Sequence, residues 1–380
     1  MPSKAPVRRS ACPRPSRQGA APRSQPRNSW PVTASGRQLV RTTLATLVLL
    51  LGPLVVALDR FGAAGDITLF VLAGVALIPL SWVIGEATDN LAIHTGPGIG
   101  GFLNATFGNA PELIIAIVAI ADGLPEIVRA SLVGSIAGNL LLVLGFTLLL
   151  GQRGTFDRRS AYISLGLVAF ATLVVLIPSV AGFRGDPNRH SLAVLSLPFA
   201  IVLLVVRLIV NRYDLRRQRQ LAEPGTGGWP LRLAIGVLGL ATLVTAFVTE
   251  TLVGTLQTFA ERAHLSDFFV AAVIVAIVGN ATEHGSAVLL ARRGRVQLAV
   301  EIPLASSAQI AGTLIPLVAL ISWAFEPFAL SFRPVELVAM AVAAALPALF
   351  LREGRTSRGP GGALLVAYAA LVVVFYFAGD

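Results

Sequence analysis

Long apolar runs recur along most of this chain, and they limit its possible folds more than any other feature. From position 41 onward, runs of roughly 18 or more residues alternate with short polar stretches. Only 13% of the residues are charged, whereas a soluble domain carries about 25%. A backbone inside hydrocarbon must satisfy its own amides, so these runs predict transmembrane helices, and the alternating pattern of a membrane β-barrel is absent. The predicted fold class is an all-α polytopic membrane protein.

Eleven apolar segments are predicted to cross the membrane. They cover approximately residues 41–58, 67–93, 101–121, 126–150, 160–180, 191–211, 232–262, 268–290, 297–323, 334–351 and 362–378. Arginine-rich and arginine-poor connections alternate along the chain, and positive residues are retained on the cytoplasmic side. This bias predicts a cytoplasmic N-terminus and an external C-terminus in a bacterial-type inner or plasma membrane. The arginines assigned to the cytoplasmic connections are Arg153, Arg158, Arg159, Arg212, Arg216, Arg217, Arg219, Arg292, Arg293, Arg295, Arg352, Arg355 and Arg358.

The polar segments divide the chain. Residues 1–38 are rich in Pro, Ser and Arg and contain no acid, which predicts a disordered basic cytoplasmic tail. The alternatives are a transit peptide or, from Arg8-Arg9, a twin-arginine signal. The remaining predicted parts are a leading helix and loop at 39–66, a first five-helix repeat at 67–211, a cytoplasmic linker at 212–231 and a second, inverted five-helix repeat at 232–380.

An internal repeat underlies this division. GNAPELIIAI at 108–117 matches GNATEHGSAV at 279–288 with a displacement of 171 residues. Five predicted crossings separate the copies, and this odd number makes the copies enter the membrane in opposite directions. Inverted repeats are typical of secondary transporters, whose sites form at the midplane between the repeats.

Each copy of the repeat places one glutamate, Glu112 or Glu283, inside an apolar segment. An ionised carboxylate there costs about 2.5–3.5 kcal/mol even on lenient scales, so the pair predicts a functional site. The alternative is a protonated glutamate that hydrogen-bonds Asn109 or Asn280 as helix-packing glue. The asparagine and glutamate of each copy are spaced i, i+3 on one helix face, and Pro111 frees backbone carbonyls in the first copy.

The oxygen-rich set of residues favours a hard cation. Ca²⁺ takes about 6–8 oxygen ligands from carboxylates, amides, backbone carbonyls and water. No cysteine lies in any predicted helix, which removes the soft ligands for copper or zinc, and no cofactor is predicted. Two facing carboxylates cannot both stay ionised without a cation. The site is therefore expected to hold Ca²⁺ or protons but not to stand empty and doubly charged, which couples the two ions.

Other polar residues are weaker candidates. Glu86 and Glu250 are candidate secondary proton sites, with a helix-terminal position as the alternative. Four further polar residues are candidates for lining the cavity, and hydrogen bonding between helices explains their presence nearly as well. That group is Ser135, Asn139, Ser306 and Gln309. His284 is a candidate proton relay, although a structural role is slightly favoured because adjacent helix residues point in different directions.

The formal net charge of +10 does not predict nucleic-acid binding, because the arginines lie in a tail and in short loops rather than on one folded face. The lone Cys12 excludes an intrachain disulfide. The predicted partners are Ca²⁺, H⁺ and the lipid bilayer.

The motifs resemble those of the calcium/cation antiporter superfamily, and specifically its Ca²⁺/H⁺ exchanger branch. The resemblance is carried by GGFLNATFGNAPELIIAI at 100–117, VGNATEHGSAV at 278–288 and SLVGSIAGNLLLVLG at 131–145. It extends over about residues 67–378 and implies one leading helix plus two five-helix repeats. It also implies cation coordination at Glu112 and Glu283. The positions with implied supporting roles are Asn109, Asn280, Glu86, Glu250, Ser135, Ser306 and Gln309.

Competing functions remain within and beyond this class. Na⁺-coupled Ca²⁺ exchange and H⁺-coupled exchange of Na⁺, K⁺ or Mn²⁺ use similar residues, and a passive cation channel would conduct without proton counter-movement. An intramembrane protease requires paired aspartates, a Ser/His dyad or an HExxH motif, and the predicted helices contain none of these. An antiporter rather than an enzyme is therefore expected.

Overall fold

The computed structural model of the chain describes residues 50–183, 186–218 and 228–379. This part is almost entirely helical, and its one isolated β-bridge joins Thr155 and Arg355. Eight of the described helices are long and apolar enough to cross a membrane, or nine if the bent pair Asp267–Gly279 and Ala281–Arg292 is one span. The all-α polytopic membrane fold predicted from the sequence is confirmed.

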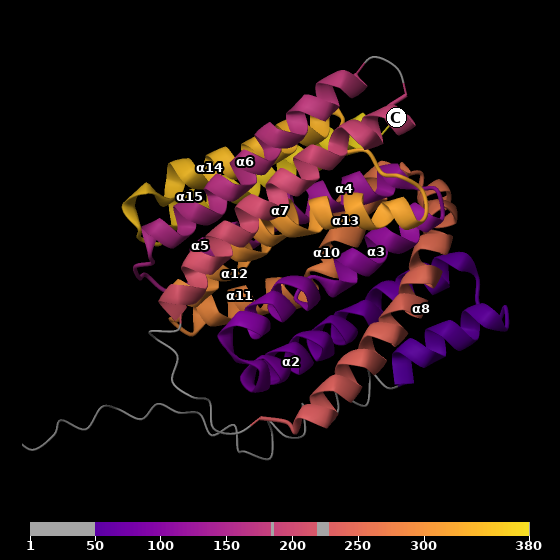
Figure 1. Cartoon of the computed structure of the whole chain (residues 1–380), viewed down its shortest axis with the longest axis horizontal. Coiled ribbons are helices and arrows are strands. Elements are labelled where there is room, and N and C mark those ends of the chain that lie inside the picture. Colours follow the sequence, from indigo (N-terminus) through magenta and orange to yellow (C-terminus); the bar gives the residue numbers. More distant parts are fainter. Residues whose placement is uncertain (1–49, 184–185, 219–227, 380) are drawn as a thin grey trace, which may run out of the picture. The chain divides into compact units, whose positions relative to one another are not determined.

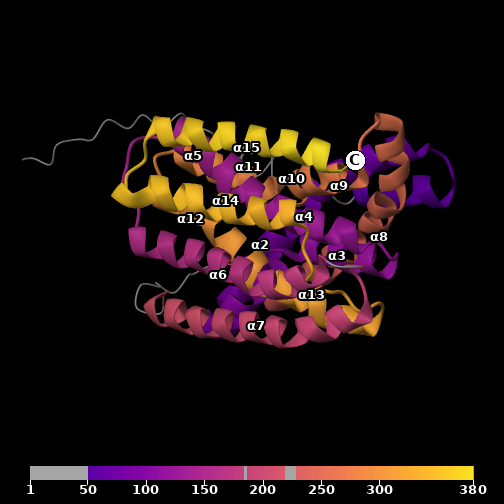
Figure 2. The same cartoon turned by 90° about the horizontal axis from the view of Figure 1, so that it is seen from above.

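The helices follow the predicted apolar segments in chain order (Figure 1), and Figure 2 shows the same helices from above. After a helix at residues 50–60, the elements are α2 (Asp66–Phe107), α3 (Ala110–Ala121), α4 (Pro125–Ala137), π-helical η1 (Gly138–Val143), α5 (Leu144–Leu150), α6 (Arg158–Gly182), α7 (His190–Gln218), α8 (Leu231–Ala263), α9 (Asp267–Phe269), π-helical η2 (Val270–Val275), α10 (Ala276–Gly279), α11 (Ala281–Arg292), α12 (Val296–Gln309), π-helical η3 (Ile310–Leu314), α13 (Ile315–Ile321), 3₁₀-helical η4 (Ser322–Ala324), α14 (Pro334–Phe350), 3₁₀-helical η5 (Leu351–Glu353) and α15 (Arg358–Ala378). The count of eleven stays a prediction. The tail 1–38 and parts of 41–58 and 212–231 lie outside the described residues.

One boundary differs from the prediction. Separate helices were expected at 67–93 and 101–121, but α2 runs without a break to Phe107 and the chain breaks at Gly108-Asn109 instead. Glycine costs a helix about 1 kcal/mol and proline about 3, so the intervening glycines and Pro97 weaken the helix without forbidding it. The break therefore falls inside the repeated motif.

Helix α8 packs antiparallel along α2. The start of α2 meets the end of α8 where the Phe70 and Phe259 rings stack 4.2 Å apart. Just before the start of α8, the Trp229 amide donates to Asn90 Oδ1 at 2.8 Å. Asn90 lies about 20 residues after Phe70 on α2, which corresponds to about 30 Å of helix. Figure 1 shows the two helices side by side. The pair therefore joins elements from the two predicted halves along much of their length.

The displacement of 171 residues also relates the helix bounds. Applied to α3 it gives α11, and applied to α5 it gives α13. The α3–α4 connection lies near the start of α14, where Arg333 bridges Glu126, and the α11–α12 connection bonds the α5–α6 loop through Gln152. These two connections are at opposite ends of the span Pro125–Leu150, the arrangement that oppositely directed repeats require.

Candidate functional site

Breaks in two helices position the paired glutamates. Asn109 separates α2 from α3 and Asn280 separates α10 from α11, with a bend of 57° at the second break. Pro111 is accommodated in the first turn of α3, where its missing amide has no helical partner to lose. The second copy breaks without a proline, which the sequence left uncertain. Each break puts the glutamate in the first turn of the following helix.

Glu112 and Glu283 approach one another in the interior. Glu112 is 8% exposed, and Glu283 is the nearby charge that repels it. A side chain added at Gly279 would begin 3.5 Å from Glu112 Cγ and Oε1, so the Glu112 carboxyl packs directly on the backbone of the second motif. Ser306 of α12 lies close to Glu283. The arrangement brings the two predicted acids together, with Glu112 buried and Glu283 half-buried.

Amide and hydroxyl side chains from both motifs surround the acids. Asn109 Nδ2 donates to Gln309 Oε1 at 2.7 Å, and Asn280 Nδ2 donates to Ser135 Oγ at 2.9 Å. Asn139 Nδ2 donates to Asn280 Oδ1 at 3.2 Å and to Ser306 Oγ at 3.0 Å. The predicted residues Asn109, Asn280, Ser135, Asn139, Ser306 and Gln309 thus form one network, which we call the asparagine network.

The Asn–Ser pairs repeat across the two halves. Asn280 bonds Ser135, and Ser306 bonds Asn109 Oδ1 at 3.5 Å, so each motif's asparagine meets the serine of the other half. Two π-helical segments, η1 and η3, begin beside the network at Gly138 and Ile310. A π-helix leaves its backbone less regularly bonded and occurs frequently at functional sites.

Three oxygens in this interior have no hydrogen-bond partner. They are Glu112 Oε2, Glu283 Oε2 and Asn139 Oδ1, and each is buried. A buried polar atom without a partner costs about 1–3 kcal/mol, more when charged. All three are acceptors of the kind that a hard cation takes as ligands. No described group of three His, Cys, Asp or Glu could hold a metal, so a cation here would need amide, hydroxyl, backbone or water oxygens beside the two carboxylates.

The remaining candidates lie in different surroundings. Glu250 is exposed on α8 and pairs with Arg60 at 3.3 Å, outside the asparagine network. Glu86 is half-buried on α2, where Asp89 is close enough to repel it. His284 follows Glu283, and its Nε2 is buried without a partner. The structure therefore brings four of the secondary candidates into one network with Asn109 and Asn280, but not Glu250; the four are Ser135, Asn139, Ser306 and Gln309.

Sequence reasoning missed two parts of the interior. The position of Gly279 beside the Glu112 carboxyl is one of them. Arg129 lies inside an apolar segment, 1% exposed, and donates from Nη1 to Asn188 Oδ1 at 2.9 Å. Glu336, also 1% exposed, is close enough to stabilise the Arg129 charge. A charged residue just inside the start of the predicted segment 126–150 was the available signal for Arg129.

We expect Asn280→Ala to lower kcat/KM for cation transport about tenfold or more. The substitution leaves Asn139 Nδ2 and Ser135 Oγ each short of one hydrogen-bond partner. Radioisotope flux into vesicles measures the effect. Asn90→Ala is the matched control, because Asn90 is also buried but bonds Trp229 and its own helix instead. Equal flux in the two variants would contradict a role for the network.

Comparison with known proteins identifies the chain's relatives. The family described as sodium/calcium exchanger protein matches residues 66–209 and 233–377. A Ca²⁺/H⁺ antiporter of Synechocystis sp. is 35% identical over 341 residues, covering 82% of this chain and 92% of the relative. The Ca²⁺/H⁺ antiporter ChaA of Bacillus subtilis is 38% identical over 322 residues, covering 81% and 92%.

Solved structures agree with these relatives. Native YfkE, 34% identical, superposes with a TM-score of 0.76 over 88% of this chain and 99% of its own. The H⁺/Ca²⁺ exchanger CAX, at 16% identity, has a TM-score of 0.69 over 90% and 92% and supports the fold alone. The family match covers most of the chain in two segments, and the relatives match along nearly their whole length. This chain belongs to the sodium/calcium exchanger protein family.

Proposed function

We propose that this chain is a secondary active transporter that exchanges Ca²⁺ for H⁺ across the membrane by alternating access. The observation that carries the proposal is the close pair Glu112 and Glu283, each with one buried carboxylate oxygen that has no hydrogen-bond partner. Relatives named Ca²⁺/H⁺ antiporters, at 35% and 38% identity, support the same pair of ions. The chain acts as a transporter, not an enzyme, and Ca²⁺ is its substrate.

Charge balance provides the coupling. Two ionised carboxylates close together in a poorly hydrated interior repel one another, and both lose hydration. One Ca²⁺ neutralises the same two groups that two protons neutralise. If the protein reorients only when the pair is neutralised, Ca²⁺ leaving on one side must be replaced by protons before the site returns. The asparagine network joins Asn109 and Asn280, the residues at the two helix breaks that carry the glutamates.

The network also supplies candidate ligands. Asn139 Oδ1 is free to accept a cation, while its amide is held by Asn280 and Ser306. We assign Asn109 and Asn280 to the site because they lie at the two helix breaks. The N-terminus is assigned to the cytoplasm and the C-terminus to the outside on the arginine bias of the loops.

Everted vesicles test this function. Vesicles with an acidic lumen should accumulate ⁴⁵Ca²⁺ and lose part of their pH gradient when Ca²⁺ is added, in buffer free of Na⁺. Uptake that requires an imposed Na⁺ gradient would instead assign Na⁺ coupling. Ca²⁺ flux that leaves the pH gradient unchanged, with or without Na⁺, would indicate a passive channel.

A further inference from the structure

Three loops are joined into one rigid surface at the same end of the helices. Gln152 Nε2 donates to the Arg292 carbonyl at 3.0 Å, which ties the α5–α6 loop to the α11–α12 connection. The Gly154 amide donates to Thr356 Oγ1 at 2.9 Å, and the Thr356 amide donates to the Gly154 carbonyl at 3.0 Å. These two bonds tie the same loop to the α14–α15 connection. Phe156 N also donates to the Gly354 carbonyl at 3.0 Å. These bonds therefore fix the backbones of the three loops relative to one another.

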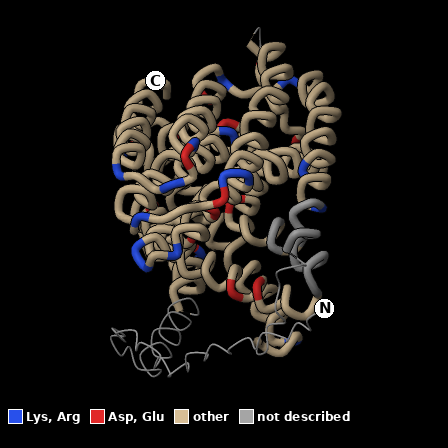
Figure 3. The backbone as a smooth tube through the Cα atoms, turned by 90° about the vertical axis from the view of Figure 1, so that its left-hand side faces the viewer, with Lys and Arg blue, Asp and Glu red and all other residues tan. Residues whose placement is uncertain are grey.

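The joined loops carry nine arginines, and every one of them is exposed. We call this set the arginine surface: Arg153, Arg158, Arg159, Arg292, Arg293, Arg295, Arg352, Arg355 and Arg358. The acids in the same loops are Asp157, which accepts the Arg159 amide at the start of α6, and Glu353. Figure 3 looks onto this end of the helices and shows blue segments spread across it. The surface has a strong positive excess.

Its depth corresponds to the headgroup region of a bilayer. Each loop is short and directly joins two helices of the membrane-spanning type, for example Pro334–Glu353 and Arg358–Ala378. Arginines within a few residues of a span's end lie where lipid phosphates lie. The nine guanidinium groups are thus presented to phosphates at the membrane surface, each with several donors in a planar fork that suits phosphate oxygens.

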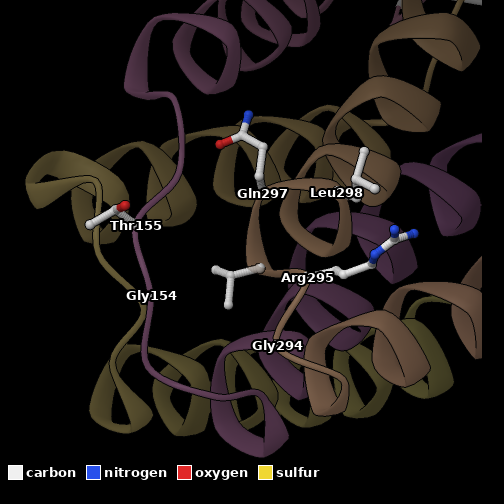
Figure 4. Close-up of a pocket in the computed structure, with 7 residues that line it drawn as sticks. Gly154, Thr155, Gly294, Arg295, Gln297 and Leu298 are labelled. Carbon is white, nitrogen blue, oxygen red and sulfur yellow. The ribbon is translucent and has the colours of Figure 1, made fainter. Parts of the chain in front are cut away.

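A pocket opens within this surface (Figure 4). Its volume is about 330 Å³. One wall comes from the α5–α6 loop at Gly154 and Thr155, and the other from Gly294 to Leu298 at the start of α12. Figure 4 shows the two chain segments facing one another, with the Arg295 side chain extending away from Gly154 and Thr155. The pocket is a recess between two of the joined loops, large enough for a phosphate group with part of its glycerol.

We propose that the arginine surface, which includes Arg295 at the edge of the recess, binds the headgroups of anionic phospholipids. Each basic residue near an anionic membrane surface adds about 1 kcal/mol of attraction, and basic pockets on the cytoplasmic side of membrane proteins bind such headgroups. The retention of arginines on one side during insertion explains why these loops are basic. It does not explain why the loops are bonded to one another beside a recess. Bound lipid holds the outer ends of α11 and α12, whose inner parts carry Glu283 and Ser306.

Lipid selectivity of the purified full-length protein tests the proposal. The protein is reconstituted in phosphatidylcholine vesicles that contain a minority of spin-labelled phosphatidylglycerol or, separately, spin-labelled phosphatidylcholine. The wild type should prefer phosphatidylglycerol, and the preference should fall with added salt. The triple substitution Arg292→Gln, Arg293→Gln and Arg295→Gln should lower the preference about tenfold or more.

Controls separate this role from general charge and from insertion. The double variant Arg60→Gln and Arg262→Gln removes two exposed arginines that lie outside the arginine surface, and it should keep the wild-type preference. An equal preference in the triple variant and the wild type would overturn the proposal. If the triple variant does not insert, a wild-type preference that is insensitive to salt overturns it. Displacement of the labelled lipid by inorganic phosphate or by RNA would assign the surface to those ligands instead.

Discussion

Glu112→Gln is expected to reduce exchange of Ca²⁺ about 100-fold or more while leaving the amount of folded protein near normal. Glutamine keeps the size and the hydrogen-bonding capacity of the side chain but removes its charge. The variant has one carboxylate left for a divalent cation, and it cannot take up and release a proton at position 112. Glu283→Gln should have the same effect, because the two acids occupy equivalent positions in the first turns of α3 and α11.

The matched control is Glu250→Gln. Glu250 also lies in a membrane-spanning helix, but it is exposed and paired with Arg60 rather than buried in the asparagine network. Exposed ion pairs contribute about 0–1 kcal/mol, so this variant should transport within about twofold of the wild type. The measurement is ⁴⁵Ca²⁺ uptake into everted vesicles, normalised to purified protein. Near-normal uptake by Glu112→Gln or Glu283→Gln would remove these residues from the mechanism.

Membrane helices and the repeated motif could be predicted because both depend on local sequence. Hydrocarbon forces an apolar run to form a helix whatever its neighbours do, so the described spans fall where hydropathy put them. The motif GNAPE/GNATE predicted the pairing of Glu112 with Glu283, and the asparagine network brings the same residues together. Sequence was sufficient here because a buried acid in an apolar run is costly, and a costly feature found twice is informative.

Features that depend on packing could not be predicted in this way. The bend at Asn280 has no proline to announce it, and it is stabilised by contacts from elsewhere, including the Thr282 hydroxyl bond to the Ile78 carbonyl at 3.2 Å. The continuation of α2 through Gly96–Gly101 likewise reflects a balance that propensity alone does not decide. Glu250 faces outward because of the way α8 is rotated about its own axis. The sequence of α8 is apolar on all sides and therefore does not determine this rotation.

The ends of the helix bundle also differ in what joins them. Where α4 meets α14, charged side chains form the contact: Arg333 bridges Glu126 at 2.6 Å, and the Arg333 amide donates to Glu336 at 2.6 Å. At the other end, backbone bonds and the neutral side chains of Gln152 and Thr356 join the loops, and the arginines face outward. The charged side chains at the α4–α14 end bond to one another within the protein. The arginines at the end with the joined loops remain available to lipid.

Gly134→Ala should prevent most of the protein molecules from reaching a stable fold, although the substitution adds only one methyl group. A Cβ at Gly134 of α4 would lie 1.9 Å from the Ala272 carbonyl oxygen and 2.6 Å from its carbon. Both are backbone atoms of the π-helical segment η2, so no side chain can rotate away. Small residues let membrane helices approach closely, and overpacking costs about 1–3 kcal/mol or more when the neighbour is rigid.

Gly138→Ala is the comparison that isolates this clash. Gly138 is buried in the same span one turn later, yet a Cβ there meets no heavy atom within 4 Å. Both substitutions change backbone freedom in the unfolded chain equally, so the difference between them reports contact with Ala272 alone. Size-exclusion yield and thermal unfolding in detergent should be near wild type for Gly138→Ala and much lower for Gly134→Ala. Equal unfolding temperatures would mean that α4 and η2 lie farther apart than the structure has them.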